Sequence, residues 1–385
     1  MRLRSGGLLL VVALAACSPK PPPPKPGPLK AGVATVTLDA PVGVSMGGYS
    51  RHRQTATEKG STWAANLPAS TGVQSMPTAR AVALSDGVTR IVLVRLHLCL
   101  TTASLRFRAE KALRERGYDA SLFVVSTHTH AGPARYFRPA PAEGSGGTDP
   151  TALAMDTFDA EVEDRLGLSI ADAAAKALDS LKPASVGVAS VEAGDFNHDR
   201  RCENDDLYGA DFRDKTLTVV RIDETDEAGN PVRPMTGFIN YPMHGTVLGG
   251  DNSLMSIDAP GAMELFGSDA VGAPLIYLQG SAGDVAPSTG PLGHGDFQGM
   301  ERIGRVAAPL IVDAFTRAAP PVRPAEATLV RFERQVLLSR ELIGYARGEY
   351  AEFGGIGCGF GGGACPPEPQ DPKSVICIPL KKRPF

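Results

Sequence analysis

The sequence lacks the features that would assign it to a membrane-spanning or a nucleic-acid-binding class. No apolar run in its 385 residues reaches the roughly 18 residues that a membrane-spanning helix requires. Basic residues are not in excess, because 39 lysines and arginines face 42 acidic residues and no Lys/Arg-rich block occurs. Nucleic-acid phosphates need a concentrated basic surface. The composition therefore argues against nucleic acid as a partner.

Cysteine is scarce and never occurs as a CxxC pair, which makes a four-cysteine metal site unfavourable. Cys99 lies in the apolar run Ile91–Leu100 and is predicted to be a buried free thiol. Four further cysteines lie in polar or glycine-rich stretches: Cys202, Cys358, Cys365 and Cys377. Disulfides among these four are compatible with export to an oxidising compartment, but their connectivity stays open.

The first residues have the order of an export signal. Met1–Arg4 is short and basic, Leu8–Ala16 is apolar, and small residues precede Cys17. We predict a signal peptide over residues 1–16. The stretch Leu14–Cys17 also resembles the lipobox of bacterial lipoproteins, in which the cysteine is acylated and becomes the new N-terminus. The alternative is a plain cleaved signal with an incidental cysteine.

Residues 17–31 would then form a lipid-anchored tether. Ser18–Pro28 is rich in proline, which makes a chain extended and semi-rigid. A small neutral residue directly after the acylated cysteine resembles the lipoproteins that are sent to the outer membrane. We therefore expect a protein of the cell envelope, anchored by Cys17 to the bacterial outer membrane and in contact with the membrane surface, facing the periplasm or the cell exterior.

From residue 32 onward the chain alternates strand-like and helix-like segments, which predicts an α/β domain over residues 32–353. Its clearest unit is strand–helix–strand, formed by Ile91–Leu100, Ala103–Gly117 and Leu122–Val125. Residues 354–385 differ in composition, being rich in glycine, cysteine and proline, and are expected to form a tail outside this domain.

Two more helices and several strands are expected in the domain. The helices are Glu161–Leu181, which Pro183 ends, and Glu301–Ala318. The strand-like runs are Val33–Leu38, Ala81–Leu84, Val186–Val191, Leu217–Ile222, Gly237–Tyr241, Leu275–Leu278 and Val330–Leu337.

The strongest local signal is the stretch Ser126–Pro133, which reads Ser-Thr-His-Thr-His-Ala-Gly-Pro and directly follows a buried strand. Side chains alternate along an extended chain, so His128 and His130 would point to the same side if the extended geometry continues. Two imidazoles at the end of a buried strand suit a metal site or a proton-transfer site. The alternative is a pair of ordinary polar groups at the surface.

A third histidine and a glycine-rich turn follow two later strands. His244 closely follows one strand, and the turn Gln279–Pro287, which contains Asp284, directly follows another. Loops that follow strands commonly converge to build sites in α/β proteins. His244 is therefore a candidate third imidazole, while Asp284 could either orient a histidine or simply cap a tight turn.

Taken together, these stretches resemble the N-terminal catalytic region of neutral (non-lysosomal) ceramidases. Five stretches match that family in order between residues 32 and 320: Met46-Gly47-Gly48-Tyr49, Ala79-Arg80, Thr-His-Thr-His-x-Gly-Pro at 127–133, His-Gly-Thr at 244–246, and Gly-Asp-Val-x-Pro at 283–287. The resemblance implies an α/β fold with a mixed sheet, similar to metallohydrolases. It also implies cleavage of the amide of N-acylsphingosine to a fatty acid and sphingosine.

Position by position, the resemblance implies that His128 and His244 bind zinc and that His130 lies near the scissile bond. Zinc lowers the pKa of bound water to about 7 and polarises carbonyl groups. His130 would stabilise the oxyanion or protonate the leaving amine. Asp258 matches an aspartate in the family's Ser-x-Asp-x-x-Gly stretch, for which we expect a supporting role.

The sequence departs from the family at three places. Ala286 stands where the family turn has a serine, and Arg200, with Arg201 as the alternative, corresponds only loosely to the arginine of the family's Asn-Arg-Ser segment. The family's other zinc ligands, a glutamate after Pro-Gly and a tyrosine, find no counterpart before Phe385, and neither does its C-terminal β-sandwich. We therefore expect a shortened C-terminal end.

The sequence thus predicts a zinc-dependent amidohydrolase that acts on ceramide or another N-acyl lipid. Two alternatives stay open. One is a zinc hydrolase of the same ancestry that acts on a different N-acyl or ester lipid. The other is a catalytically inactive envelope lipoprotein of the same fold.

Overall fold

A computed structural model describes residues 25–49, 61–138, 152–194, 196–200, 213–283, 285–290, 297–319 and 329–333. Several sequence predictions lie outside these residues: the signal peptide, Cys17, most of the tether, the tail from residue 354, Asp284, Arg201 and all cysteines except Cys99.

The fold is built on a mixed sheet of eight strands in the order β11-β9-β8-β6-β1-β3-β4-β5. Its strands are β1 (Lys30–Thr37), β3 (Thr78–Ser85), β4 (Arg90–Leu96), β5 (Ser121–Ser126), β6 (Lys182–Glu192), β8 (Thr216–Thr225), β9 (Pro231–Tyr241) and β11 (Leu275–Gln279). Most neighbours are antiparallel, but β4 pairs with β5, and β9 with β11, in parallel.

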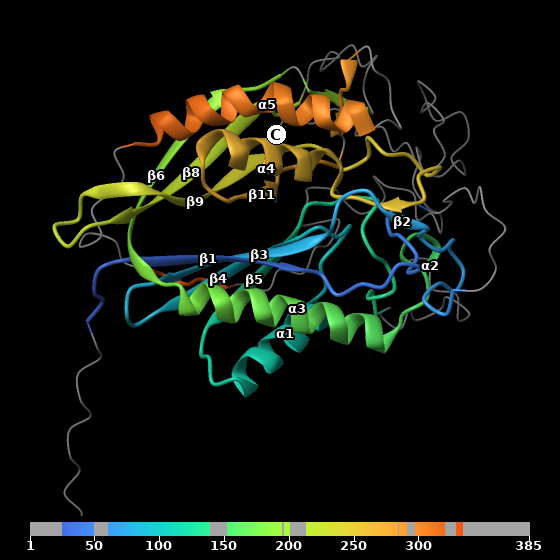
Figure 1. The fold of residues 1–385 in the computed structure, drawn as a ribbon, viewed down its shortest axis with the longest axis horizontal. Helices are drawn as coiled ribbons and strands as arrows, with labels where there is room; N and C mark the ends of the chain where they lie inside the picture. The colour runs from blue at the N-terminus through green and yellow to red at the C-terminus, as the bar shows by residue number, and fades with distance from the viewer. Residues whose placement is uncertain are drawn as a thin grey trace, which may run out of the picture.

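The sheet folds over at its middle. β1 and β6 share only two register pairs, Lys30 with Pro183 and Ala31 with Lys182. Beyond this short junction the strands diverge, so that the half with β1, β3, β4 and β5 faces the half with β6, β8, β9 and β11 (Figure 1). The fold-over brings strands that are far apart in the sheet order, such as β5 and β11, into contact.

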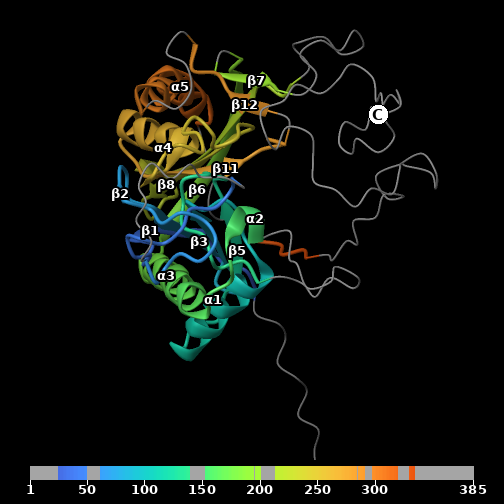
Figure 2. The same ribbon diagram turned by 90° about the vertical axis from the view of Figure 1, so that its right-hand side faces the viewer.

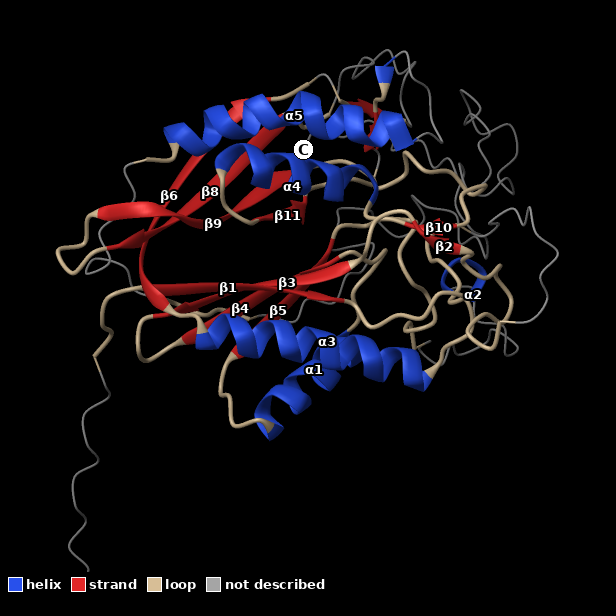
Figure 3. Ribbon diagram, in the orientation of Figure 1, coloured by secondary structure: helices blue, strands red, loops and turns tan. Residues whose placement is uncertain are grey.

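Two pairs of helices cover the outer faces of the folded sheet. The helices are α1 (Ala103–Glu115), α3 (Ala160–Asp179), α4 (Asp258–Val271) and α5 (Phe297–Arg317). Figure 2 shows α1 and α3 at one side of the molecule and α4 and α5 at the opposite side. The result is four layers, helix–sheet–sheet–helix (Figure 3).

Three apolar clusters hold the layers together. The first lies between α1, α3 and the first half-sheet and includes Val92, Val94, Leu105, Leu113 and Leu166. The second lies under α4 and α5 and includes Ile239, Met263, Leu275, Ile303 and Ile311. The third, between the half-sheets, is small and consists of Ala31, Val82, Ala184, Ile222 and Ile276 with partly buried neighbours. Burial of these side chains provides most of the driving force for folding.

The predicted α/β class and the strand–helix–strand unit are confirmed. β4, α1 and β5 follow the predicted order, and the parallel pairing of the two strands runs from Ile91 with Ser121 to Leu96 with Ser126. The helices predicted near residues 161–181 and 301–318 correspond to α3 and α5. None of the helices in the described part of the chain is long and apolar enough to cross a bilayer.

Two parts of the sequence prediction differ from the structure. Helix α4 was not predicted, because Pro260, Gly261 and Gly267 lower its intrinsic helix propensity. The strand predicted at Val330–Leu337 is wrong over its described residues 330–333, which form no regular structure. Val330 and Phe332 are 82% and 78% exposed, so these apolar side chains do not pack into the core formed by the described residues.

Four short strands and one short helix lie in the connections. They are β2 (Gly72–Val73), which pairs with β10 (Leu254–Met255), β7 (Asn197–Asp199), which pairs with β12 (Val285–Pro287), and α2 (Ala152–Met155).

Candidate metal centre

The first histidine loop leaves β5 and turns sharply. β5 ends at Ser126, and His128 has a left-handed backbone with φ of 63°. His128 and His130 do converge, with 3.3 Å between their Nε2 atoms. The expected reason was wrong, since the chain is no longer extended at His128 and a turn, not strand alternation, brings the two imidazoles together.

The second histidine loop leaves β9 and lies directly against the first. A parallel bridge joins Thr129 to Gly245, and the N–H of His130 donates to the carbonyl of Gly245 at 2.9 Å. This contact brings the Nε2 atoms of His128 and His244 to 2.9 Å of each other. The predicted third imidazole therefore joins the first two at one place, at the ends of β5 and β9.

Backbone carbonyls fix the orientation of two of these rings. Nδ1 of His128 lies 2.7 Å from the carbonyl oxygen of Cys99, and Nδ1 of His244 lies 2.5 Å from that of Ala282. A carbonyl only accepts, so each Nδ1 must carry a proton. In a neutral ring the lone pair then lies on Nε2. Burial lowers the pKa of His128, more strongly than the contact with Cys99 raises it, and thus favours the neutral ring.

This arrangement fits a metal ion. Two imidazole lone pairs that face each other at 2.9 Å repel, whereas a cation shared by them turns this repulsion into attraction. Tetrahedral zinc with Zn–N bonds of 2.0–2.1 Å would separate two ligand nitrogens by about 3.3 Å. The separations of 2.9 and 3.3 Å are close to that value. The hydrogen bonds from Nδ1 to carbonyls are also the usual outer contacts of metal-binding histidines.

Cys99 lies beside the imidazoles but on their other side. Cys99, His128 and His130 each offer one ligand atom within 4.8 Å of the others. The sulfur lies 3.8 Å from Nδ1 of His128, which already donates to a carbonyl. Burial raises the pKa of the Cys99 thiol to about 12. Cys99 is a buried free thiol, as predicted, and the better donor set is on the Nε2 side.

The ring of His130 is held by the segment Met46–Tyr49. A Cβ at Gly48, where φ is 116°, would lie 2.4 Å from Cγ of His130, so only glycine allows this approach. On another side the ring of Tyr49 meets His130 edge-on, with 4.7 Å between the centroids, and the Tyr49 hydroxyl donates to the carbonyl of Leu248 at 2.9 Å. The sequence signalled this segment only through the family resemblance.

Arg200 lies at the edge of the cluster. Its Nη2 lies 3.0 Å from Nε2 of His244 and donates to the carbonyl of Gly283 at 2.9 Å. It directly follows β7, which pairs with β12 and places Ala286 opposite His198. The guanidinium therefore supplies positive charge beside the imidazoles.

Asp258 does not face the imidazoles. Its carboxylate accepts from the backbone N–H groups of Val247 and Leu248, both at 3.1 Å. Burial raises the pKa of this carboxyl to about 6, although these backbone donors and that of Ala259 act to lower it. Asp258 therefore holds the loop that follows His244.

Sequence reasoning could not find the two carbonyls that orient His128 and His244. Every residue supplies a carbonyl, so neither Cys99 nor Ala282 gives a signal of this kind in the sequence. Only the spatial approach of their loops gives them this role.

Comparisons with known proteins agree with the fold and with the motifs. The structure is similar to a solved ceramidase complexed with C2, with a TM-score of 0.62 and 20% identity over 76% of this chain and 44% of that one. It is also similar to the neutral ceramidase from Pseudomonas aeruginosa, with a TM-score of 0.62 and 19% identity over 77% of this chain and 46% of that one. The chain thus spans less than half the length of these two structures.

Identity this low establishes the fold alone. A search of curated proteins found no significant match. The family model for the N-terminal part of neutral/alkaline non-lysosomal ceramidases, however, matches residues 31–294, which is more than half of the chain. That span contains all three converging histidines, Arg200 and Asp258. The chain therefore belongs to the neutral/alkaline non-lysosomal ceramidase family.

Proposed function

We propose that this protein is a zinc-dependent amidohydrolase that cleaves the amide of N-acylsphingosine, giving a fatty acid and sphingosine. The observation that carries the proposal is the separation of 2.9 Å between the Nε2 atoms of His128 and His244, both with Nδ1 committed to a carbonyl. Membership of the ceramidase family supports the choice of an amide-linked lipid as substrate.

In this proposal His128 and His244 hold the zinc ion. Zinc bound there would lower the pKa of water and polarise the amide carbonyl, which makes hydrolysis feasible at neutral pH. The carbonyls of Cys99 and Ala282 keep both rings in the tautomer that ligation requires, and such outer contacts raise the basicity of the ligating nitrogen.

His130 and Arg200 complete the proposed site. His130 is fixed against Gly48 and Tyr49 with its Nε2 toward the other imidazoles, where it would protonate the leaving amine or hydrogen-bond the oxyanion. The Arg200 guanidinium would stabilise negative charge that develops on the carbonyl oxygen. Water supplies the hydroxyl of the new carboxylic acid, and the amine nitrogen takes up a proton as the carbon–nitrogen bond breaks.

The test is hydrolysis of a short-acyl fluorescent ceramide by the full chain, after chelation and after zinc is added back. We expect turnover that chelation abolishes and zinc restores. Alanine at His128 or at His244 should lower turnover by at least about 100-fold, since outer-shell changes alone cost 10- to 100-fold. Arg165→Ala, which removes an exposed ion pair on α3, is the control and should leave turnover unchanged.

Two other results would redirect the proposal. Zinc-dependent turnover of N-acyl amino acids or lipid esters in place of ceramide would keep the site and change the substrate. A folded protein that turns over none of these lipids, with or without zinc, would contradict an enzymatic function and favour an inactive lipoprotein of this fold.

We also propose that Cys17 is acylated and anchors the protein to the bacterial outer membrane, next to a lipid substrate. Cells that express the full chain should incorporate labelled palmitate into it, and the protein should sediment with outer membranes. Cys17→Ser should lose both the label and the sedimentation. Retention of both by the variant would contradict the anchor.

A further inference from the structure

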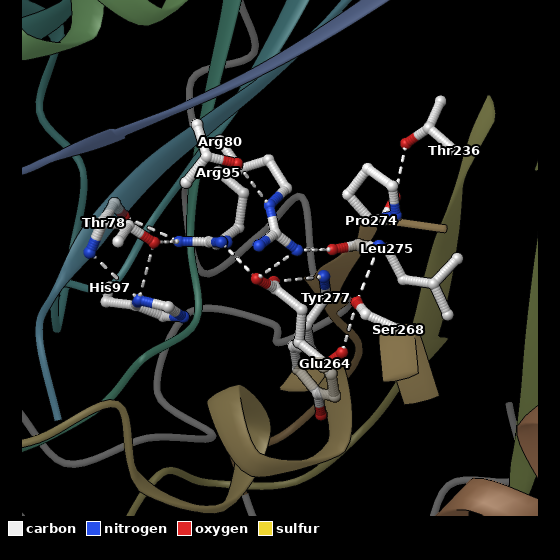
Figure 4. Close-up of polar contacts among 11 residues, drawn as sticks. Thr78, Arg80, Arg95, His97, Thr236, Glu264, Ser268, Pro274, Leu275 and Tyr277 are labelled. Carbon is white, nitrogen blue, oxygen red and sulfur yellow. Dashed lines mark hydrogen bonds and ion pairs between the residues drawn. The ribbon is translucent and has the colours of Figure 1, made fainter. Parts of the chain in front are cut away.

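A buried ion network lies where the two halves of the sheet meet α4. The side chain of Arg95, on β4, is fully buried, and that of Glu264, on α4, is 4% exposed. One guanidinium nitrogen of Arg95 pairs with Oε1 of Glu264, and Nη1 of Arg80, on β3, lies 3.0 Å from the same oxygen (Figure 4). We call Arg80, Arg95 and Glu264 the buried ion frame.

Stability alone does not explain this frame. Removing a guanidinium and a carboxylate from water costs free energy that their attraction roughly offsets, and apolar side chains of similar volume are often at least as stabilising. Chain neighbours of the frame, such as Val94 and Met263, belong to the apolar clusters. The three charged side chains are therefore better explained by the fixed positions that their contacts impose on the strands and on α4.

The frame fastens β3 and β4, from one half of the sheet, and β11, from the other half, to α4. The second oxygen of Glu264 accepts from the backbone N–H of Tyr277, on β11, at 3.0 Å. Arg95 also donates from Nη1 to the carbonyl of Thr78 at 2.6 Å, at the start of β3. A planar guanidinium presents its donors in a rigid fork, so these contacts fix the orientation of β4 relative to α4 as well as the distance between them.

Of these strands, β4 and β11 lead to the two carbonyls that orient the imidazoles. From Arg95 the chain runs four positions to Cys99, whose carbonyl holds His128 at 2.7 Å. From Tyr277 it runs five positions to Ala282, whose carbonyl holds His244 at 2.5 Å. The contact between β4 and β11 through Glu264 thus lies four and five residues before the two groups that orient the rings.

We propose that the buried ion frame positions the metal centre: by fixing β4 against β11, it sets the separation of His128 and His244 and thereby the metal affinity. This inference rests on the proposed function only in taking zinc as the metal. Its residues touch neither imidazole, so they act as positioning residues.

The test compares two variants of the full chain by zinc affinity, measured in competition with a chromophoric chelator. Arg95→Met with Glu264→Leu replaces the fully buried ion pair by apolar side chains. Arg80 loses its carboxylate partner, but its side chain is 18% exposed and keeps its hydrogen bonds to Thr35 and to the carbonyl of Leu275. We expect its zinc affinity to fall by about 10- to 100-fold, the range seen when outer contacts of metal ligands are lost. The Co²⁺ absorption spectrum should shift at the same time, because ligand geometry changes.

Leu166→Ala is the matched control. Leu166, on α3, is fully buried in the apolar cluster under that helix, so its truncation should lower the unfolding midpoint without removing a contact of the buried ion frame. Its zinc affinity should equal that of the wild type. Equal affinities in the double variant and the wild type, or equal losses in the double variant and this control, would overturn the inference.

Two further measurements cover the remaining cases. If the double variant does not fold, Arg95→Lys is tested in its place, because lysine keeps the positive charge but lacks the planar set of donors of arginine. A zinc affinity equal to that of the wild type in Arg95→Lys would contradict the inference. If the wild type binds no zinc, the proposed function fails, and histidine NMR decides the inference. Protonated Nδ1 at both His128 and His244 in the wild type, replaced by mixed tautomers in the folded frame variant, would support it, whereas unchanged tautomers would refute it.

Discussion

Gly245 decides how closely the two histidine loops approach. A Cβ at this position would lie 2.7 Å from the carbonyl oxygen of His128 and 2.7 Å from Cα of Thr129. Both contacts are to backbone, which cannot move aside without moving the imidazoles. The separation of 2.9 Å between His128 and His244 therefore depends on a residue that carries no functional group.

Asp258 should make the folded protein less stable as the pH rises, whereas carboxyl groups with a lowered pKa make it more stable. Its pKa is about 6 in the folded protein against 3.8 for an ordinary aspartate. A raised carboxyl pKa means that the folded state binds the proton more tightly, so stability from this group is full below pH 3.8 and is lost as the pH rises through 6. Relative to Asp258→Asn, the wild type should lose about 2 kcal/mol between pH 4.5 and pH 8.

Urea unfolding of the wild type and of Asp258→Asn at both pH values measures this change. The asparagine variant shares every other titrating group, so the difference between the two free energies of unfolding isolates the carboxyl. A difference that does not vary with pH would show that the backbone donors of Val247 and Leu248 compensate fully for burial of the charge.

At the scale of elements, α4 links the sheet to the metal centre. Its first residue, Asp258, holds the loop after His244, and Glu264, near its middle, contacts β4 and β11. Its other side packs against α5, where Gly304 lies so close that an added Cβ would be 2.8 Å from the carbonyl oxygen of Ala262. The position of α4 is thus fixed by contacts with both its neighbours.

Gly304→Ala should push the two helices apart. Overpacking of this kind costs about 1–3 kcal/mol, because backbone must move to admit the methyl group. Thermal or urea unfolding should show a loss in that range. Thr316→Ala, at an exposed position of the same helix, should change stability by less than about 0.5 kcal/mol. An unchanged unfolding free energy for Gly304→Ala would mean that α5 can shift freely over α4.

At the scale of the whole molecule, the centre takes imidazoles from both halves of the folded sheet, and its two proposed zinc ligands come one from each half. His128 follows β5 in one half, and His244 follows β9 in the other. The halves share a short β1–β6 junction and a small apolar cluster. A metal ion at the centre would therefore add a further link between the halves, far along the chain from this junction.

Zinc should consequently raise the unfolding midpoint of the full chain. At a free concentration 100 times the dissociation constant, a ligand that binds only the folded state adds about 2.7 kcal/mol. Calorimetry with and without zinc measures the shift, and His128→Ala should abolish it. A rise of equal size in the variant would place the stabilising ion elsewhere.

Local patterns in the sequence determined the α/β class, the unit of β4, α1 and β5, and the position of three histidines just after strands. They could do so because periodicity, capping and strand ends depend on neighbours in the chain. The family followed from motif order, which is also a property of the chain. Zinc, the substrate and the lipid anchor stay predictions.

Only the tertiary structure decided how the histidines meet. The left-handed backbone of His128, the carbonyls of Cys99 and Ala282, and the ion pair of Arg95 with Glu264 all depend on contacts between segments distant in sequence. Helix α4 forms despite its glycines and proline because packing against α5 and the sheet outweighs intrinsic propensity. Such contacts form only when the sheet has folded over. The residues that make each contact lie far apart in the chain, so local sequence patterns cannot predict them.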